Sequence, residues 1–207
     1  MKYIIPSIGR AGSTLIWTLI ASSSQKDAIN CDNFQEIARV DEGSIKTHDF
    51  FHYEPSYDYR AIFMYDDIED IIASLYEKNK HFLHVHFRHL KIPFIYWLIC
   101  FLLLQIEKAW GKRIFREKIF AFLIKGDKFK FKRNVQTWKK SKHVLFIDYK
   151  DLHKDKAGTL QRISDFVGCK IDDFELRPRS TSTDAVPQSL KDLIKIHYAD
   201  FPSLITS

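Results

Sequence analysis

Short apolar runs alternate along the chain with stretches in which apolar residues recur at helical spacing. Three of the short runs, residues 2–6, 60–65 and 144–149, have the length and the bounding turn residues of β-strands, and residues 44–48 are a further strand candidate. Within residues 60–65, Ala61 to Met64 are all apolar, which is typical of a strand buried on both faces. The pattern therefore predicts a sheet with at least one central, buried strand.

Three longer segments have the spacing of amphipathic helices; they cover residues 13–22, 67–76 and 160–167. Gly168 follows the third segment, and a glycine commonly ends a helix. Strands that alternate with helices predict a mostly parallel sheet with helices on both faces, a three-layer α/β fold. A chain of 207 residues suits a single domain of this kind, residues 1–207.

The middle of the chain departs from this alternation. Residues 92–104 are almost wholly apolar, but about 13 residues are fewer than the roughly 20 needed to span a bilayer. A strongly basic stretch with interleaved Phe and Ile follows, up to Arg133. One interpretation is a core helix followed by a solvated amphipathic helix; the other is peripheral attachment to an anionic membrane. Both interpretations make residues 78–133 a helical insertion.

Composition narrows the class of protein only a little. Hydrophobic residues make up 45% and charged residues 28% of the chain, which excludes disordered and collagen-like proteins. The net charge of +6 fits a nucleic acid, a membrane surface or a small polyanion equally well. The three cysteines lie far apart, which excludes a zinc ribbon and favours a reducing compartment. Because polar residues follow Pro6 at once, we expect no signal peptide and a cytoplasmic protein.

The most informative segment lies between the first predicted strand and the first predicted helix. It reads Gly9-Arg10-Ala11-Gly12-Ser13-Thr14. Backbone N–H groups of such a loop and of the following helical turn converge on one point, where the helix dipole adds positive potential. The loop lacks the Gly-Lys-Ser/Thr ending of nucleotide triphosphatases. It is therefore either an anion-binding loop or an ordinary turn with Ser13 as the helix N-cap.

Further segments extend the pattern beyond the loop. In chain order they are Lys46-Thr47-His48 at a strand end, Tyr65 to Asp70 followed by Ser74, Val144 to Leu152, and Phe166-Val167-Gly168. Together with the loop, these segments resemble the motifs of the sulfotransferases that use 3′-phosphoadenosine 5′-phosphosulfate (PAPS). The resemblance is spread over residues 3–168. The region between Ser74 and Trp138 matches nothing in that family.

The resemblance implies a P-loop-like architecture and an enzyme that moves a sulfuryl group from PAPS to a hydroxyl or amine of a carbohydrate, lipid or small-molecule acceptor. Residues 78–133 would then lie on the acceptor side. His48 would be the general base, since imidazole titrates near neutral pH, with Lys46 and Arg10 stabilising charge. Asp49 and Glu54 are the alternative bases. The residues expected to bind PAPS are Arg10, Ala11, Gly12, Ser13, Thr14, Ser74, Arg177 and Arg179.

The sequence departs from the family in two places. Asp66 stands where the family has an arginine that binds the 3′-phosphate, and a carboxylate there repels phosphate. The Lys-Gly-x-x-Gly loop of the family is absent, and a basic stretch that begins at Arg177 replaces it. We hypothesise that Arg177 or Arg179 supplies the missing charge. The alternative is a donor site that has decayed.

Two other functions stay open at this point. A small-molecule kinase of the phosphate-loop lineage would need the missing loop lysine and a carboxylate for Mg²⁺. A non-catalytic binding protein built on a decayed sulfotransferase would be consistent with Asp66. We expect no metal, because His81, His84, His86 and His89 lack acidic or cysteine partners. The expected partners are a small-molecule, glycan or lipid acceptor and no nucleic acid, with contact to an anionic membrane as an open alternative.

Overall fold

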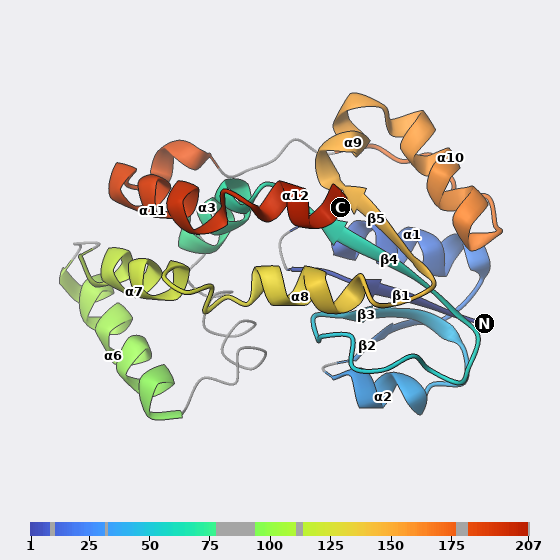
Figure 1. The fold of residues 1–207 in the computed structure, drawn as a ribbon, viewed down its shortest axis with the longest axis horizontal. Coiled ribbons are helices and arrows are strands. Elements are labelled where there is room, and N and C mark those ends of the chain that lie inside the picture. Colours follow the sequence, from blue (N-terminus) through green and yellow to red (C-terminus); the bar gives the residue numbers. More distant parts are fainter. Residues whose placement is uncertain (9–10, 32, 78–93, 111–113, 177–181, 207) are drawn as a thin grey trace. The chain divides into compact units, whose positions relative to one another are not determined.

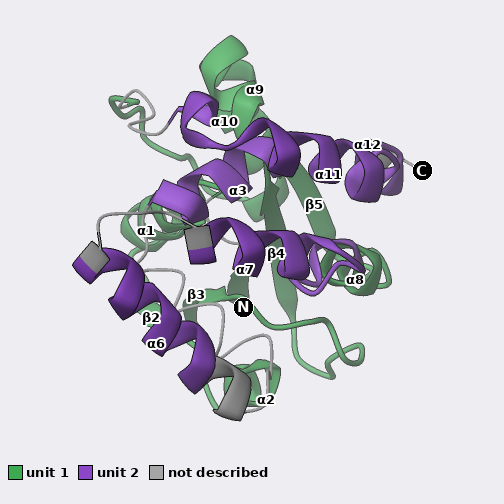
Figure 2. Ribbon diagram, turned by 90° about the vertical axis from the view of Figure 1, so that its left-hand side faces the viewer, with its two compact units in different colours: residues 1–66, 133–178 green, residues 67–132, 179–207 purple. Residues whose placement is uncertain are grey.

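The computed structural model describes residues 1–8, 11–31, 33–77, 94–110, 114–176 and 182–206. These residues form two compact units. The first consists of Met1–Asp66 and Arg133–Pro178, and the second of Asp67–Lys132 and Arg179–Ser207 (Figure 2).

The first unit is built on a five-stranded parallel sheet (Figure 1). Its strands are β1 (Lys2–Pro6), β2 (Ala28–Asn30), β3 (Gly43–Thr47), β4 (Tyr59–Tyr65) and β5 (Val144–Asp148). They lie in the order β2-β3-β1-β4-β5, and every pairing is parallel. Each of the four predicted strands is confirmed within one residue at either end. The central β1 is buried along its whole length.

This strand order fixes where ligands can bind. After β1 the chain continues to β2 on one side of it, and after β4 it continues to β5 on the other side, so the two connections diverge between β1 and β4. In an open parallel sheet, the crevice beyond the carboxyl ends of such strands is the usual ligand site. Ser7 directly follows β1 and bridges to Met64 near the end of β4. Residues just after β1, β3 and β4 therefore lie at the edge where chemistry is expected.

Helices cover both faces of the sheet, which confirms the predicted α/β layering. The helices of this unit are α1 (Ser13–Ser24), α2 (Phe34–Ala38), most of α8 (Phe131–Trp138), α9 (Tyr149–Lys154) and α10 (Lys156–Val167). The segment after α10 is tied to α1 by a hydrogen bond from the Asp172 N–H to the Ser23 hydroxyl. On α2 and α8, Phe34 and Trp138 pack edge to face, with ring centroids 5.8 Å apart.

Local capping explains where two of the helices begin and end. Asp148 accepts the N–H of Lys150 at 2.9 Å and starts α9, and Asp155 accepts the N–H of Gly158 at 2.9 Å and starts α10. The predicted helix over residues 160–167 therefore begins earlier, at Lys156. Its predicted end is confirmed, because Gly168 adopts the left-handed conformation and its N–H bonds to the Ser164 carbonyl.

The second unit is helical. It contains α3 (Ile68–Glu77), α6 (Phe94–Trp110), α7 (Ile114–Ile124), the short 3₁₀ helix η2 (Thr183–Ala185), α11 (Gln188–Tyr198) and α12 (Phe201–Thr206). An ion pair with an N–O distance of 3.2 Å joins Arg116 of α7 to the buried Glu107 of α6. The same guanidinium donates to the Tyr76 carbonyl at the end of α3. Throughout the described ranges, no helix has both the length and the apolar character that crossing a bilayer requires.

Candidate functional site

A histidine and a serine meet where β1 and β3 end. Parallel pairing puts Pro6 opposite Thr47, so the next residues, Ser7 and His48, leave the sheet side by side. Nδ1 of His48 lies 3.0 Å from the Ser7 hydroxyl and 3.2 Å from the Ser7 carbonyl oxygen. Since a carbonyl oxygen only accepts, this contact favours the tautomer with hydrogen on Nδ1. The lone pair is then on Nε2, which is the arrangement that a general base needs.

The first turn of α1 adjoins this pair. Ser13 is the first residue of the helix, is 4% exposed, and accepts a hydrogen bond from the Ser7 hydroxyl at 3.0 Å. Gly12, with φ of 74°, occupies the N-cap position and provides no side-chain cap. The alternative of an ordinary turn with Ser13 as the N-cap is therefore wrong as to the capping residue. The Ser13 hydroxyl belongs instead to a chain of contacts that runs from Ser13 through Ser7 to His48.

Lys46 brings a positive charge to the same turn. Its ammonium donates to the Thr14 hydroxyl at 2.7 Å and lies 5.8 Å from the centroid of the Trp17 ring. The first N–H groups of a helix have no partner within the helix and carry the positive end of its dipole. A cation fixed beside them makes this corner attractive to an anion.

Tyr149 is a part of the site that the sequence did not reveal. It is the first residue of α9, directly after β5, and its ring lies over Gly12. A Cβ atom on Gly12 would be 2.2 Å from Cδ2 of that ring. Burial raises the pKa of the Tyr149 phenol, so the group stays neutral at physiological pH. The glycine thus allows the left-handed turn and makes room for the tyrosine.

The segment that carries His48 is held from α8. Nδ2 of Asn134 donates to the His48 carbonyl at 3.4 Å, and the Trp138 indole donates to the Asp49 carbonyl at 2.9 Å. Asn134 is 6% exposed, and its Oδ1 has no hydrogen-bond partner within the described part of the chain. These two hydrogen bonds anchor the backbone of His48 and Asp49 to α8.

The two alternative bases take part in other contacts. The Asp49 carboxylate accepts the N–H groups of Phe34 and Phe50, at 2.8 and 2.9 Å. The Glu54 carboxylate accepts the Tyr59 hydroxyl at 2.7 Å and the Lys142 N–H at 3.3 Å. Each of these carboxylates stabilises local backbone or a neighbouring strand.

Other predicted site residues divide into two groups. Arg10, Arg177 and Arg179 lie outside the described residues. Ala11 is fully buried beside Gly12 in the first unit, whereas Ser74 is 5% exposed on α3 in the second unit. The structure thus brings Gly12, Ser13, Thr14, Lys46 and His48 together in one unit.

Aspartates lie at the carboxyl ends of β4 and β5. Asp66, directly after β4, is 1% exposed, at the divergence of the strand connections described above. Asp148 at the end of β5 accepts the Lys150 N–H as the cap of α9. Burial, together with Asp148 and Asp151, raises the pKa of Tyr65 to about 12.

Over the described ranges no three His, Cys, Asp or Glu side chains are grouped as a metal site would require, and the four clustered histidines lie outside those ranges.

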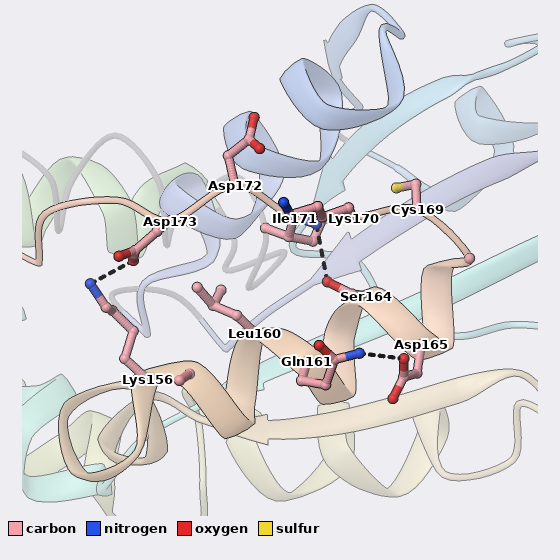
Figure 3. A pocket seen from close by; sticks show the side chains of 12 residues that line it. Lys156, Leu160, Gln161, Ser164, Asp165, Cys169, Lys170, Ile171, Asp172 and Asp173 are labelled. Carbon is pink, nitrogen blue, oxygen red and sulfur yellow. Dashed lines mark hydrogen bonds and ion pairs between the residues drawn. The ribbon is translucent and has the colours of Figure 1, made fainter.

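A separate cavity of about 880 Å³ lies between α10 and the segment that follows it (Figure 3). Leu160 lines it, and its rim carries an ion pair of 2.6 Å between Lys156 and Asp173 and a hydrogen bond of 2.7 Å from Gln161 to Asp165. None of the predicted site residues lines this cavity. Because three carboxylates, Asp165, Asp172 and Asp173, line the cavity and Lys156 is paired with one of them, it differs from the cationic corner around Lys46.

The chain is similar in sequence to one protein family and in fold to solved structures. A family model described as "Sulfotransferase domain" matches residues 32–195. The structure of mouse sulfotransferase SULT7A1 complexed with PAP is similar with a TM-score of 0.52 and 16% sequence identity, over 99% of this chain and 83% of that chain. A retinol dehydratase in complex with androsterone and inactive cofactor PAP is similar with a TM-score of 0.41 and 14% identity, over 99% of this chain and 69% of that one. No curated protein matches the chain in sequence.

Proposed function

Because the chain belongs to the sulfotransferase domain family, we propose that it transfers a sulfuryl group from PAPS to a hydroxyl or amine of a carbohydrate, lipid or small-molecule acceptor. The observation that carries this proposal is the pairing of an anion corner with a base at one sheet edge. Lys46 and Thr14 form the corner, and the Ser7–His48 pair provides the base.

The donor side of the proposal uses the start of α1. The 5′-phosphosulfate is held by the N–H groups of the first turn, the Thr14 hydroxyl and the Lys46 ammonium, with Arg10 as a further charge. During transfer, negative charge grows on the bridging oxygen that leaves with the phosphate. Donors already in place lower the energy of that state without reorganisation.

On the acceptor side, His48 performs the proton transfer. Nε2 removes the proton of the acceptor hydroxyl or amine as that oxygen or nitrogen forms its bond to sulfur. The bond between sulfur and the phosphate oxygen breaks in line, and the adenosine 3′,5′-bisphosphate leaves with both electrons of that bond. The contact between Nδ1 and the Ser7 carbonyl stabilises the imidazolium that results.

The 3′-phosphate requires a charge that Asp66 does not provide. We assign this role to Arg177 and Arg179, with Ser74 as a hydroxyl donor. If Arg177→Ala and Arg179→Ala both leave donor affinity unchanged, this assignment is wrong and the charge comes from elsewhere.

The function is tested by titrating adenosine 3′,5′-bisphosphate into the purified chain by calorimetry, without divalent metal. We expect saturable binding that sulfate ion alone does not reproduce. A preference for Mg·ATP would identify a kinase, and binding of neither nucleotide would identify a decayed protein that retains only the fold. Transfer of labelled sulfate from PAPS to a panel of alcohols, sugars and amines then identifies the acceptor class.

Lys46→Met is expected to weaken bisphosphate binding by about 10- to 150-fold, the equivalent of one charge-assisted hydrogen bond of about 1.5–3 kcal/mol. Methionine keeps the length and apolar character of the side chain but removes the ammonium that contacts Thr14. Lys140→Met, at an exposed lysine of the same unit, serves as the matched control. Equal affinities of the two variants would remove Lys46 from the donor site.

A further inference from the structure

The second unit exposes an aromatic side chain among lysines. Phe122 on α7 is 52% exposed, although its neighbours Phe120, Leu123 and Ile124 are buried. An exposed phenylalanine therefore stands out on a helix that already has a filled apolar face. Single exposed apolar residues are common, so Phe122 is informative only in combination with what surrounds it.

Lysines lie close to this ring. Lys118 is four residues before Phe122 and therefore on its face of α7, Lys125 directly follows the end of α7, and both are exposed. The Lys128 ammonium lies 4.6 Å from the centroid of the ring. Residues 114–132 contain six Lys and Arg side chains against two Asp and Glu, but Arg116 is paired with Glu107 and Lys132 with Asp200. The positive charge beside the ring therefore comes from Lys118, Lys125 and Lys128.

A neighbouring helix exposes an apolar stripe. Ile99, Leu102 and Ile106 are spaced by three and four residues and therefore share one face of α6. They are 47%, 51% and 40% exposed. The opposite side of α6 carries the buried Leu104 and Glu107, and the ion pair of Glu107 with Arg116 ties it to α7. The inner face of α6 is thus fixed, and its outward face is apolar.

We propose that α6 and α7 dock this protein on a membrane that contains anionic lipid. Phe122 and the stripe of Ile99, Leu102 and Ile106 would enter the boundary between headgroups and acyl chains. Lys118, Lys125 and Lys128 would contact the lipid phosphates and carboxylates. Shallow insertion of apolar side chains flanked by lysines is how a helix binds at the interface without crossing the bilayer.

The combination of groups selects a bilayer over two other partners. A nucleic acid would use the lysines but leaves the aliphatic stripe of α6 in water, because its outer surface is a row of phosphates. A symmetric contact with a second copy of this chain would bring the lysine cluster against itself and is opposed by repulsion. Of these three partners, the anionic bilayer is the one that matches both the charges and the apolar side chains.

Sedimentation with lipid vesicles tests this inference. We expect the chain to sediment with vesicles of phosphatidylcholine and phosphatidylserine at low salt, to be released at high salt, and to remain in the supernatant with phosphatidylcholine alone. Each lysine near the surface is expected to contribute about fivefold to partitioning. Lys118→Gln combined with Lys125→Gln should therefore lower the partition coefficient about 25-fold.

Apolar variants separate insertion from attraction by charge alone. Phe122→Ser and Leu102→Ser should each weaken binding at constant salt, whereas Ile196→Ser should not. Ile196 is the matched control, because it is 72% exposed on α11 and lies on neither helix of the docking surface. Circular dichroism melts of all variants verify folding. Binding by Phe122→Ser equal to wild type, binding of an RNA homopolymer in place of vesicles, or a dimer in solution whose formation these variants abolish would each overturn the proposal.

Discussion

His48→Asn is expected to lower the rate of sulfuryl transfer by about 10²–10⁴-fold, the range that general base catalysis contributes. An asparagine amide can still donate to the Ser7 carbonyl from the position of Nδ1, so the loop keeps its contact. What is lost is Nε2 and its lone pair. Affinity for adenosine 3′,5′-bisphosphate should therefore stay close to that of the wild type, while single-turnover transfer from PAPS slows.

His52→Asn is the matched control for this variant. His52 lies four residues further along, with its side chain 45% exposed, and its ring pairs with Asp49 and packs against Phe34. It should retain near-normal transfer. If His48→Asn and His52→Asn are equally active, the proton goes to another group. Ser7→Ala should show a smaller loss than His48→Asn, because the Ser7 carbonyl remains to hold Nδ1.

The pattern of apolar and polar residues was sufficient to predict β1, β3, β4 and β5 and two helices of the first unit, α1 and α10, but not α2, α8 or α9. β1, β4 and β5 are mostly apolar runs, and burial of such runs dominates their conformation, whereas β3 has a single large apolar residue, Ile45. β2 was missed because it is three residues long, with exposed or partly exposed side chains, and exists by pairing with β3. Its stability comes from a partner strand whose paired residues lie 16 positions later in the chain, which no local pattern contains.

The same limit applies to the site. Thr14, Lys46 and His48 could be proposed because each belongs to a motif with a local spacing. Ser7 and Tyr149 could not, because their roles come from register. Ser7 contacts His48, 41 residues further along the chain, because β1 and β3 pair in parallel. Tyr149 follows β5 and packs on Gly12, which follows β1.

The charges at the sheet edge relate the two departures from the family pattern, Asp66 in place of an arginine and the basic stretch that begins at Arg177. The β1–β3 side carries Lys46, while the β4 side carries the buried Asp66. An anion is therefore favoured beside α1 and disfavoured beside the end of β4. For this reason the proposed donor depends on a second cationic group for its 3′-phosphate, and loss of the Arg177 and Arg179 side chains is the sharper test of that end of the ligand.

The packing of Tyr149 on Gly12 leads to a large effect on stability. Gly12→Ala puts a Cβ 2.2 Å from the tyrosine ring in a residue with φ of 74°. The left-handed conformation costs an alanine about 1–2 kcal/mol, and overpacking adds about 1–3 kcal/mol. We expect a loss of about 2–5 kcal/mol in the free energy of unfolding, measured by urea denaturation, and a PAPS turnover at least about 10²-fold lower, because the loop must shift.

Gly126 separates the two causes of this loss. It has φ of 72°, but an added Cβ there would meet only the end of the Lys128 side chain, at 4.0 Å. Gly126→Ala should therefore cost only the conformational part, about 1–2 kcal/mol. Removing the ring in Gly12→Ala/Tyr149→Ala should cost less than the sum of the two single changes, because the clash is gone. Strict additivity would mean that the tyrosine does not press on the loop, and the glycine would then be required by its backbone conformation alone.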